Sequence, residues 1–467
     1  MAVVAAAALL PALPSGVNAA AARPSAAAGA GAAALGGSWG NAEEVPGTAA
    51  LNTGGSAAIS SVSCASAGNC SAGGFYAGDS GQQVFVVSQK KDRWGKAEEV
   101  PGIAALNTGG LAVISSVSCA SAGNCSAGGQ YSTLSSGNFA PFQAFVISQR
   151  NGRWGNAEEV PGTAALNSGA QAEVYSVSCA SAGNCSAGGY YTDSSGEQSF
   201  VVSQANGNWG KAEKVPGLAA ISTMGNVNSV SCTSAGNCVA GGYFVKSVGA
   251  NAFVVSQKKG TWGKALEIPR MGSIGSLSCP SAGNCSAGSG GIVVSQKDGT
   301  WGKAEEVPGL AALNKGGHAF ITSVSCAAAG YCSVGGYSAV DFQDQGFVVS
   351  QKNSTWGNAE EVPGLAALNK GESAFVISVS CGSAGNCSAG GFYSTTPHQP
   401  YSQAFVVSQD KGSWGNAKKI PGLAALDTGR FAVINSVSCA SAGNCSVGGL
   451  YSDRSHHSQA FVVSQAR

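Results

Sequence analysis

Charged side chains are scarce in this sequence of 467 residues, since only 10% are lysine, arginine, aspartate or glutamate and the formal net charge is +1. No basic stripe and no acidic tail concentrates charge of one sign, which argues against a nucleic-acid partner. Beyond the N-terminal segment, no stretch approaches the roughly 18–20 apolar residues that a membrane helix needs. We therefore expect no nucleic-acid partner and no membrane span in the mature chain.

Helical periodicity is also missing, because no segment keeps its apolar residues at a sustained 3.6-residue spacing. Glycine is abundant, with 69 residues, but it does not recur at every third position, which excludes a collagen. The hydrophobic fraction of 44% is too high for a disordered chain. The sequence therefore predicts a folded and almost entirely β protein.

The N-terminal segment, residues 1–19, has features of a secretory signal. An apolar run covers residues 3–13, and Val17-Asn18-Ala19 resembles the small-residue end of a cleavage site. No lysine or arginine precedes the run, so an Ala-rich tail is the alternative interpretation. Residues 20–37 are rich in alanine, glycine and serine and predict a flexible linker. The folded domain is expected to cover residues 38–467.

Sixteen cysteines form eight pairs of the pattern C-x5-C, and successive pairs are 47 to 60 residues apart. Such self-similarity is typical of propellers and solenoids. The five residues between the cysteines, mostly Ala-Ser-Ala-Gly-Asn, favour a tight turn, and a hairpin places its two flanking residues at a distance that a disulfide can span. A zinc site would favour a shorter spacing and further ligands. We predict one hairpin disulfide per unit and an oxidising compartment; the pairs are Cys64–Cys70, Cys119–Cys125, Cys179–Cys185, Cys232–Cys238, Cys279–Cys285, Cys326–Cys332, Cys381–Cys387 and Cys439–Cys445.

Four short strands can be recognised in each unit, and we call them A to D. In the first unit, strand A covers residues 59–63, strand B residues 70–76 and strand C residues 84–89. Strand D covers residues 94–100 and ends at Pro101-Gly102, because proline cannot continue a hydrogen-bonded ladder.

The phase of the repeat indicates how the chain closes. The first repeated element is a D strand that begins at Trp39, and the last is a C strand over residues 461–465. Pairing these two completes the last unit and removes the open sheet edges of a linear array. We predict an eight-bladed β-propeller of four-stranded blades in which the N-terminal strand closes the last blade.

Strand B ends in Gly-Gly and an aromatic residue, and a loop, an apolar strand, a tryptophan and Val-Pro follow; residues 188–216 show this best. The pattern resembles the kelch repeat of galactose-oxidase-like propellers, although Ser203 stands where that family has a tyrosine and kelch units do not carry the cysteine pair. The units are also similar to cysteine-containing repeats of secreted actinobacterial proteins. Residues 295–301 have a weaker likeness to the sialidase Asp-box.

Three repeated features have both a structural and a functional interpretation. The eight tryptophans are predicted to pack between blades, although tryptophan can also stack on sugars. Glu-Glu pairs, such as Glu98-Glu99, are predicted to be solvated outer-strand charge because adjacent strand residues point to opposite faces. Asn-Cys-Ser matches a glycosylation acceptor, but the asparagine is explained by the turn.

In a propeller the A–B and C–D turns share one face, and the B–C and D–A loops share the other. The A–B turns are nearly identical between units, whereas the B–C and D–A loops vary, so the second face is the candidate binding face. Its loops are rich in tyrosine, phenylalanine, serine and aspartate, and they contain all four histidines, including His318. The candidate binding residues are Tyr131, Phe139, Phe142, Tyr191, Asp341, Phe342, Tyr393, His398, Tyr401, Tyr451, His456 and His457.

Catalytic motifs are lacking. A sialidase-like site would need an arginine triad, and a galactose-oxidase-like site would need a free cysteine for its tyrosine crosslink.

In the fifth unit the loop face is shortened at residues 288–291, which predicts a notch. We expect a secreted or cell-wall-associated monomer without metal or cofactor that binds a glycan or an extracellular protein. The alternatives are a glycan-active enzyme, with Asp341, Asp344, Asp453 and the histidines as candidates, and a passive scaffold.

Overall fold

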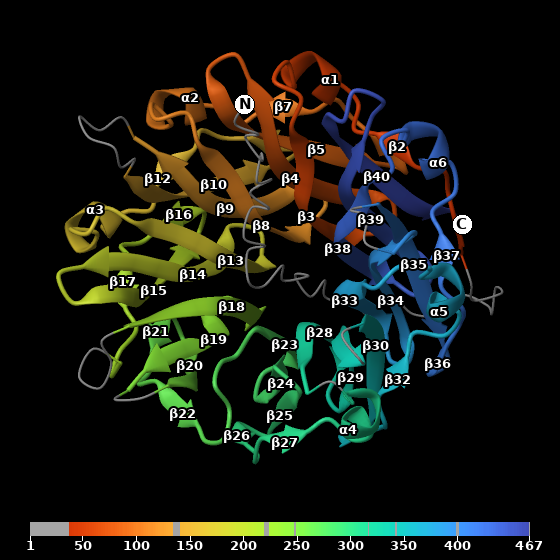
Figure 1. Cartoon of the computed structure of the whole chain (residues 1–467). Coiled ribbons are helices and arrows are strands. Elements are labelled where there is room, and N and C mark those ends of the chain that lie inside the picture. The colour runs from red at the N-terminus through yellow and green to blue at the C-terminus, as the bar shows by residue number, and fades with distance from the viewer. Residues whose placement is uncertain are drawn as a thin grey trace, which may run out of the picture.

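The computed structural model describes residues 37–133, 141–218, 224–246, 249–315, 317–340, 343–397 and 401–466. These residues form eight antiparallel sheets around a central axis, which Figure 1 views end on. The predicted eight-bladed, all-β propeller is confirmed. The proposed signal segment, residues 1–19, and all of the proposed linker except Gly37 lie outside the described residues.

Each blade begins with strand A beside the axis, and strands B and C follow outward. The A strands are β3 (Ala57–Ser66), β8 (Ala112–Ser121), β13 (Ala172–Ser181), β18 (Met224–Ser234), β23 (Ser276–Ser281), β28 (Ala319–Ala328), β33 (Ala374–Ser383) and β38 (Ala432–Ser441). The B strands are β4 (Asn69–Gly78), β9 (Asn124–Ser132), β14 (Asn184–Asp193), β19 (Asn237–Val245), β24 (Asn284–Ser289), β29 (Tyr331–Val340), β34 (Asn386–Ser394) and β39 (Asn444–Ser452). The C strands are β5 (Gly81–Lys90), β10 (Phe142–Arg150), β15 (Gly196–Ala205), β20 (Ala250–Lys258), β25 (Ile292–Lys297), β30 (Gln343–Lys352), β35 (Ser402–Asp410) and β40 (Ser458–Ala466).

The outer strand D is split into two short pieces, both of which pair with strand C. The first pieces are β1 (Ser38–Trp39), β6 (Arg93–Trp94), β11 (Arg153–Trp154), β16 (Asn208–Trp209), β21 (Thr261–Trp262), β26 (Thr300–Trp301), β31 (Thr355–Trp356) and β36 (Ser413–Trp414). The second pieces are β2 (Glu43–Glu44), β7 (Glu98–Glu99), β12 (Glu158–Glu159), β17 (Glu213–Lys214), β22 (Leu266–Ile268), β27 (Glu305–Glu306), β32 (Glu360–Glu361) and β37 (Lys418–Lys419).

The described residues include six single-turn helices, which the sequence pattern did not predict and which occupy D–A connections at the periphery of Figure 1. Each begins after the glycine of Pro-Gly, whose backbone is left-handed, and ends before an asparagine or aspartate. The run of four residues is too short to show a 3.6-residue period. The helices are α1 (Thr48–Leu51), α2 (Ile103–Leu106), α3 (Thr163–Leu166), α4 (Leu310–Leu313), α5 (Leu365–Leu368) and α6 (Leu423–Leu426).

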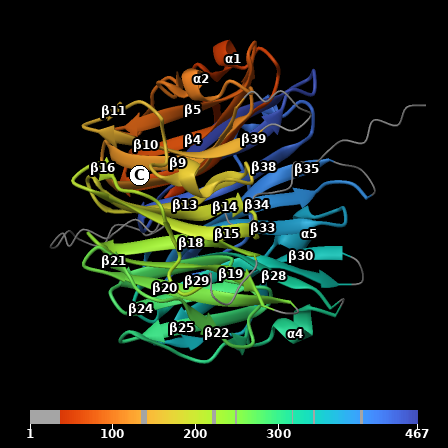
Figure 2. The same ribbon diagram turned by 90° about the vertical axis from the view of Figure 1, so that its left-hand side faces the viewer.

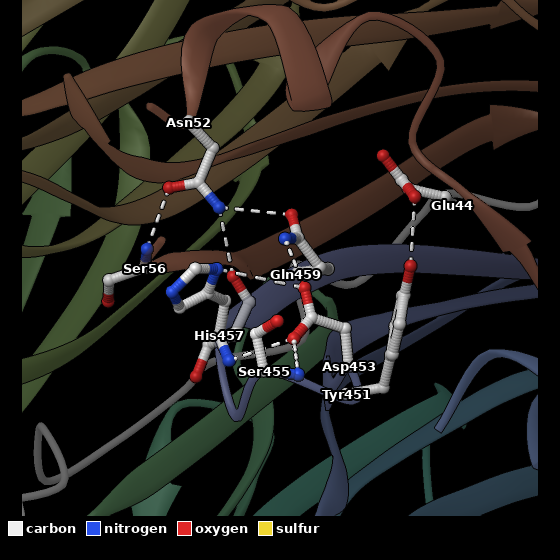
Figure 3. Close-up of polar contacts among 9 residues, drawn as sticks. Glu44, Asn52, Ser56, Tyr451, Asp453, Ser455, His457 and Gln459 are labelled. Carbon is white, nitrogen blue, oxygen red and sulfur yellow. Dashed lines mark hydrogen bonds and ion pairs between the residues drawn. The ribbon is translucent and has the colours of Figure 1, made fainter. Parts of the chain in front are cut away.

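The N-terminal strand closes the ring as predicted. Trp39 pairs with Gln465 and Glu44 pairs with Phe461, so β1 and β2 supply the outer strand of the blade that β38, β39 and β40 begin. The loops add a second connection at this seam (Figure 3), because the Asn52 side chain donates to the Ser458 carbonyl at 3.0 Å. The first and last blades are therefore joined by both sheet pairing and loop contacts.

All eight predicted disulfides are present, and among the described residues no cysteine is free. The paired Cα atoms are 3.9 to 4.1 Å apart, and Cys64 lies directly opposite Cys70 in the antiparallel hairpin of the first blade. Each bridge therefore joins strands A and B of its own blade and leaves blade-to-blade adhesion to other contacts.

A ring of serine hydroxyls joins neighbouring blades. In the Ser-Val-Ser-Cys sequence of strand A, Ser61 accepts a hydrogen bond from the Val117 N–H at 3.0 Å, and Ser63 accepts one from the Cys119 N–H at 2.9 Å. An equivalent pair of bonds joins every one of the eight blade-to-blade contacts. These buried serines satisfy backbone donors of inner strands that have no ladder partner on their axial side.

The apolar core is divided among the eight blade-to-blade contacts. In one such cluster, Phe85 and Val87 of strand C pack with Ala460 and Val462 of the preceding blade, and Trp94 closes the outer end. The predicted packing role of the tryptophans is confirmed, since the others occupy the same place in their clusters. The first glycine of each Gly-Gly pair faces the same interface, because a Cβ at Gly73 would come within 3.0 Å of the Ile114 and Val117 side chains of the next blade.

Candidate functional site

The two faces of the propeller carry different loops, as the topology predicts. On one face the Asp92 N–H of a C–D turn donates to the Gly68 carbonyl of an A–B turn at 3.0 Å. On the other, the Gln82 N–H beside a B–C turn donates to the Gly110 carbonyl of a D–A loop at 2.8 Å. In Figure 2 the strands that follow C–D turns, such as β16 and β21, lie at the left, and α4 and α5 of the D–A loops lie at the right. We call the second side the loop face.

Four of the predicted binding residues are buried on strand B. Tyr131, Tyr191, Tyr393 and Tyr451 are 0–3% exposed and belong to the cores between blades. Alternation along the strand explains this burial. Each tyrosine is the second residue after Gly-Gly, and its side chain therefore points to the opposite face of the sheet from that of the first residue after Gly-Gly. Their rings offer no surface to a ligand, so the prediction that these four tyrosines bind a ligand is wrong.

The other predicted residues are more accessible but do not form one cluster. Phe142 and Tyr401 are half-buried, and the Arg430 guanidinium lies 5.4 Å from the Tyr401 ring centroid. His456 and His457 are exposed on a turn in which Asp453 accepts the His457 N–H at 3.0 Å (Figure 3). The remaining candidates, Phe139, Asp341, Phe342 and His398, lie outside the described residues. Within the described ranges, no group of three or more histidine, cysteine, aspartate or glutamate residues could hold a metal ion.

The residues that distinguish the blades most clearly were missed by the sequence prediction. They are the first residue after Gly-Gly in strand B and its partner in strand A, at the loop-face end of the two innermost strands. We call them the axial pairs. They are Ala58 with Phe75, Val113 with Gln130, Glu173 with Tyr190, Asn226 with Tyr243, Phe320 with Tyr337, Phe375 with Phe392, and Val433 with Leu450. Variation at one position of an otherwise repetitive strand was the signal that could have found them.

The axial pairs of the third and fourth blades form a polar network with neighbouring residues. Glu173 accepts a hydrogen bond from the Ser115 hydroxyl of the second blade at 2.7 Å. Glu197, at the start of strand C, accepts from the Tyr243 hydroxyl at 3.0 Å and from Asn226 Nδ2 at 3.2 Å, both of the fourth blade. We call this group the acidic cluster; its members are Ser115, Glu173, Tyr175, Tyr190, Glu197, Asn226 and Tyr243.

Burial makes the two carboxyl groups of the acidic cluster unusually basic. Glu173 is 8% exposed, and its burial raises its pKa to about 7, although the Ser115 hydrogen bond opposes the shift. Burial also raises the pKa of Glu197 against the hydrogen bonds from Tyr243 and Asn226. The ion pairs found among the described residues involve neither glutamate. Two carboxyl groups are thus held near each other without a cation, which is an arrangement found at functional sites.

The axial pairs of the sixth and seventh blades are aromatic instead. Ring centroids are 5.3 Å apart for Phe320 and Tyr337, 4.2 Å for Tyr337 and Phe375, and 4.9 Å for Phe375 and Phe392. This aromatic row therefore continues across two blades, and Phe320 at its end is 45% exposed. The other three rings are half-buried, so the row presents one exposed and three partly exposed aromatic side chains.

The fifth blade separates the acidic cluster from the aromatic row. Its strands β23, β24 and β25 have six residues each, whereas those of the first blade have ten. The hairpin and its disulfide are retained, so the missing residues come from the loop-face ends. We call this lowered part of the rim the notch. Met224 on one side of it and Phe320 on the other are 43% and 45% exposed.

Comparisons with known proteins define the fold and no more. No model of a known protein family matches the chain, and no curated protein matches it. Among solved structures, Sqt1 of Chaetomium thermophilum is similar with a TM-score of 0.51 and 10% identity, over 91% of this chain and 98% of that one. Sqt1 bound to the N-terminus of the ribosomal protein L10 is similar with a TM-score of 0.48 and 10% identity, over 89% of this chain and 98% of that one. The Hadza microbial sialidase Hz136 has a TM-score of 0.41 and 8% identity, over 81% of this chain and 68% of that one. In the described part of the chain, no helix has the length and apolarity to cross a membrane.

Proposed function

We propose that this protein is a secreted binding module that engages an extracellular protein or a glycan through its loop face. The observation that carries the proposal is the asymmetry of that face. A repetitive scaffold needs no variation at the axial pairs, yet these pairs are acidic and tyrosine-rich on one side of the notch and aromatic on the other. Such local variation on a rigid frame is how binding sites are built.

Secretion is supported by the eight disulfides, which favour an oxidising compartment, and by the signal-like residues 1–19. We propose that the mature protein is a monomer that uses neither metal nor cofactor. We also propose that the repeats are related to the kelch repeat, which they resemble in sequence. Function then depends on the loop face, while the disulfide-bearing face serves stability.

A glycan-active enzyme is the second candidate, and one observation favours it. Glu173 has a pKa of about 7, which suits a general acid, and Tyr243 donates to Glu197 as a tyrosine–glutamate pair. Among the described residues, those that interact with these carboxyl groups include no arginine. We favour binding because a sialidase-like reaction would need such cations to hold an acidic sugar.

The test uses residues 38–467, expressed oxidised, against a glycan array, a cell-wall polysaccharide panel and a peptide array. A variant Phe320→Ser removes an exposed ring of the aromatic row, and Leu266→Ser, with 52% exposure on the outer strand β22 of the fourth blade, is the matched control. We expect Phe320→Ser to weaken the binding of any ligand found by about tenfold, as for a contact residue of an interface, and Leu266→Ser to leave it unchanged. Product release from a bound glycan would replace the binding proposal with the enzyme, and absence of all binding would leave a passive scaffold.

A further inference from the structure

We propose that the acidic cluster is the recognition site for a lysine or arginine side chain, presented by an extended segment of a protein ligand that reaches the axis across the notch. The inference rests on the proposed binding function and names the chemistry of its ligand. It also assigns the aromatic row to the apolar residues of the same segment.

The donors and acceptors of the acidic cluster are arranged to receive a cation. Glu173 and Glu197 approach from strands A and C of the third blade, and the contacts that fix them come from neutral groups of the second and fourth blades. The rings of Tyr175 and Tyr190 have centroids 5.4 Å apart, and both tyrosines lie near enough to Glu173 and Glu197 for the carboxyl groups to raise their pKa values. Carboxylates with aromatic rings form the environment that binds ammonium and guanidinium groups.

A further acceptor in the acidic cluster has no partner. Asn226 is 7% exposed, and its Nδ2 is occupied by Glu197, but its Oδ1 accepts no hydrogen bond from any described residue. A buried carbonyl without a donor costs free energy in the unbound protein. An ammonium group carries three donors and a guanidinium five, with no acceptor, so either would supply what this amide and the two carboxyl groups lack.

The aromatic row favours a polypeptide over an amino sugar as the source of the cation. Phe320, Phe375 and Phe392 offer no hydrogen-bonding atom, and Tyr337 alone carries a hydroxyl. Sugars that stack on aromatic rings also require polar partners for their hydroxyl groups. Apolar side chains require none, so a segment that combines a basic residue with apolar residues matches both sides of the notch.

The notch provides the approach. The strands of the fifth blade are four residues shorter than those of the first, which at 3.3 Å per residue lowers the rim by about 13 Å. The fourth blade, with Asn226 and Tyr243, and the sixth blade, with Phe320 and Tyr337, border this gap on either side. An extended segment lying over the shortened blade would therefore meet residues of both groups.

The test is a binding screen of the oxidised domain against a positional library of N-acetylated, C-amidated hexapeptides. We expect selection of lysine or arginine at one position together with apolar residues at others. Changing the selected basic residue to glutamine, or changing the protein by Glu197→Gln, should weaken binding by about 30-fold or more, because a buried charge pair is lost. Glu173→Gln should act in the same direction. Glu305→Gln, which removes an exposed outer-strand charge, is the control and should change nothing.

The outcomes separate this inference from the proposed function. Basic peptides that bind the wild type and Glu197→Gln equally would overturn the cation site. Peptides or glycans whose binding depends on Phe320 but not on charge would overturn it as well, while the binding function would stand. If a glucosamine tetrasaccharide binds and the peptides do not, the inference that the cation belongs to a protein ligand is overturned. Failure of every probe would count against both proposals, provided that circular dichroism shows each variant folded.

Discussion

The Oγ of Ser436, in the last blade, accepts a hydrogen bond of 3.0 Å from the backbone N–H of Val62, in the first. This contact spans 374 residues of sequence, yet it repeats the bond that joins Ser61 to Val117 within the chain. The inner ring therefore crosses the seam without interruption. The N-terminal strand adds sheet pairing at the outer edge of the same seam.

Removing one hydroxyl of this ring should have a measurable cost at any blade. We expect Ser436→Ala to lower the free energy of unfolding by about 1–3 kcal/mol, because the buried Val62 N–H loses the hydroxyl that accepts its hydrogen bond, and Ser176→Ala to cost about the same. Ser455→Ala, whose side chain is exposed, should cost little. Urea denaturation measures all three, and a much smaller effect at Ser436 than at Ser176 would contradict an uninterrupted ring.

The architecture could be predicted from the sequence because it depends on local spacing and on phase. The turn between Cys64 and Cys70 determines its disulfide, and the D strand at Trp39 before the first complete blade determines closure. The role of the serines could not be predicted in this way. Ser61 and Val117 are 56 residues apart, and nothing within one unit indicates which hydroxyl meets the neighbouring backbone.

The candidate face could also be predicted, but the residues on it only in part. Tyr131 and Gln130 are adjacent at the loop-face end of one strand, and the sequence prediction chose the tyrosine, which is buried. Composition favoured aromatic loop residues, whereas alternation decides which of two neighbours points inward. Glu173 was missed because a single acid in a strand has no motif. Its significance comes from Ser115 and Glu197, which only the fold brings close.

A lysine in the seventh blade leaves a buried tyrosine hydroxyl without a partner. In the first blade Tyr76 donates to Glu99 at 2.6 Å, but the equivalent of Glu99 in the seventh blade is Lys419, and no described residue bonds to the Tyr393 hydroxyl. We expect Lys419→Glu to raise the free energy of unfolding by about 0.5–1.5 kcal/mol by restoring the acceptor. Denaturant unfolding at pH 7 measures this gain.

The neighbouring lysine provides the matched control for this substitution. Lys418 pairs with Val406 and is equivalent to Glu98, to which no tyrosine hydroxyl bonds in the described part of the first blade. Lys418→Glu makes the same charge change one residue away and should leave stability nearly unaltered. Equal effects of the two substitutions would mean that net charge, and not the Tyr393 hydroxyl, determines the gain.

A single disulfide should contribute modestly, because each bridge closes a short loop. For Cys64→Ala with Cys70→Ala, the loop-closure relation predicts a loss of about 2 kcal/mol in the free energy of unfolding. The backbone bond from Cys64 to Ser438 and the sheet pairing remain, so the blade should stay folded. Peptide or glycan binding at the loop face is expected to be unchanged. Collapse of the whole propeller on removal of this one pair would contradict a local role.

Glu173 should make the unbound protein less stable as the pH rises. The unfolded carboxyl group loses its proton near pH 4.5, whereas the folded one keeps it to about pH 7, because burial penalises the charge and Glu197 adds repulsion. Between these values the folded state binds more protons, so stability falls with increasing pH. Above pH 7 the penalty approaches about 3 kcal/mol. Tyr175, Tyr190 and Tyr243 are the other titratable neighbours, and burial raises the pKa of each.

Glu173→Gln removes this penalty and keeps an acceptor for the Ser115 hydroxyl. We expect the variant to match the wild type at pH 4 and to exceed it in thermal stability at pH 8, with the difference developing between pH 4.5 and 7. Glu305→Gln, at an exposed outer-strand position, should show no such pH-dependent gain. If the thermal stability of the wild type and that of Glu173→Gln fall in parallel as the pH rises, the assignment of the pH dependence to Glu173 is contradicted. If the same substitution also weakens binding of a basic peptide, the carboxyl group is retained at the expense of stability, as expected for a residue selected for its ligand.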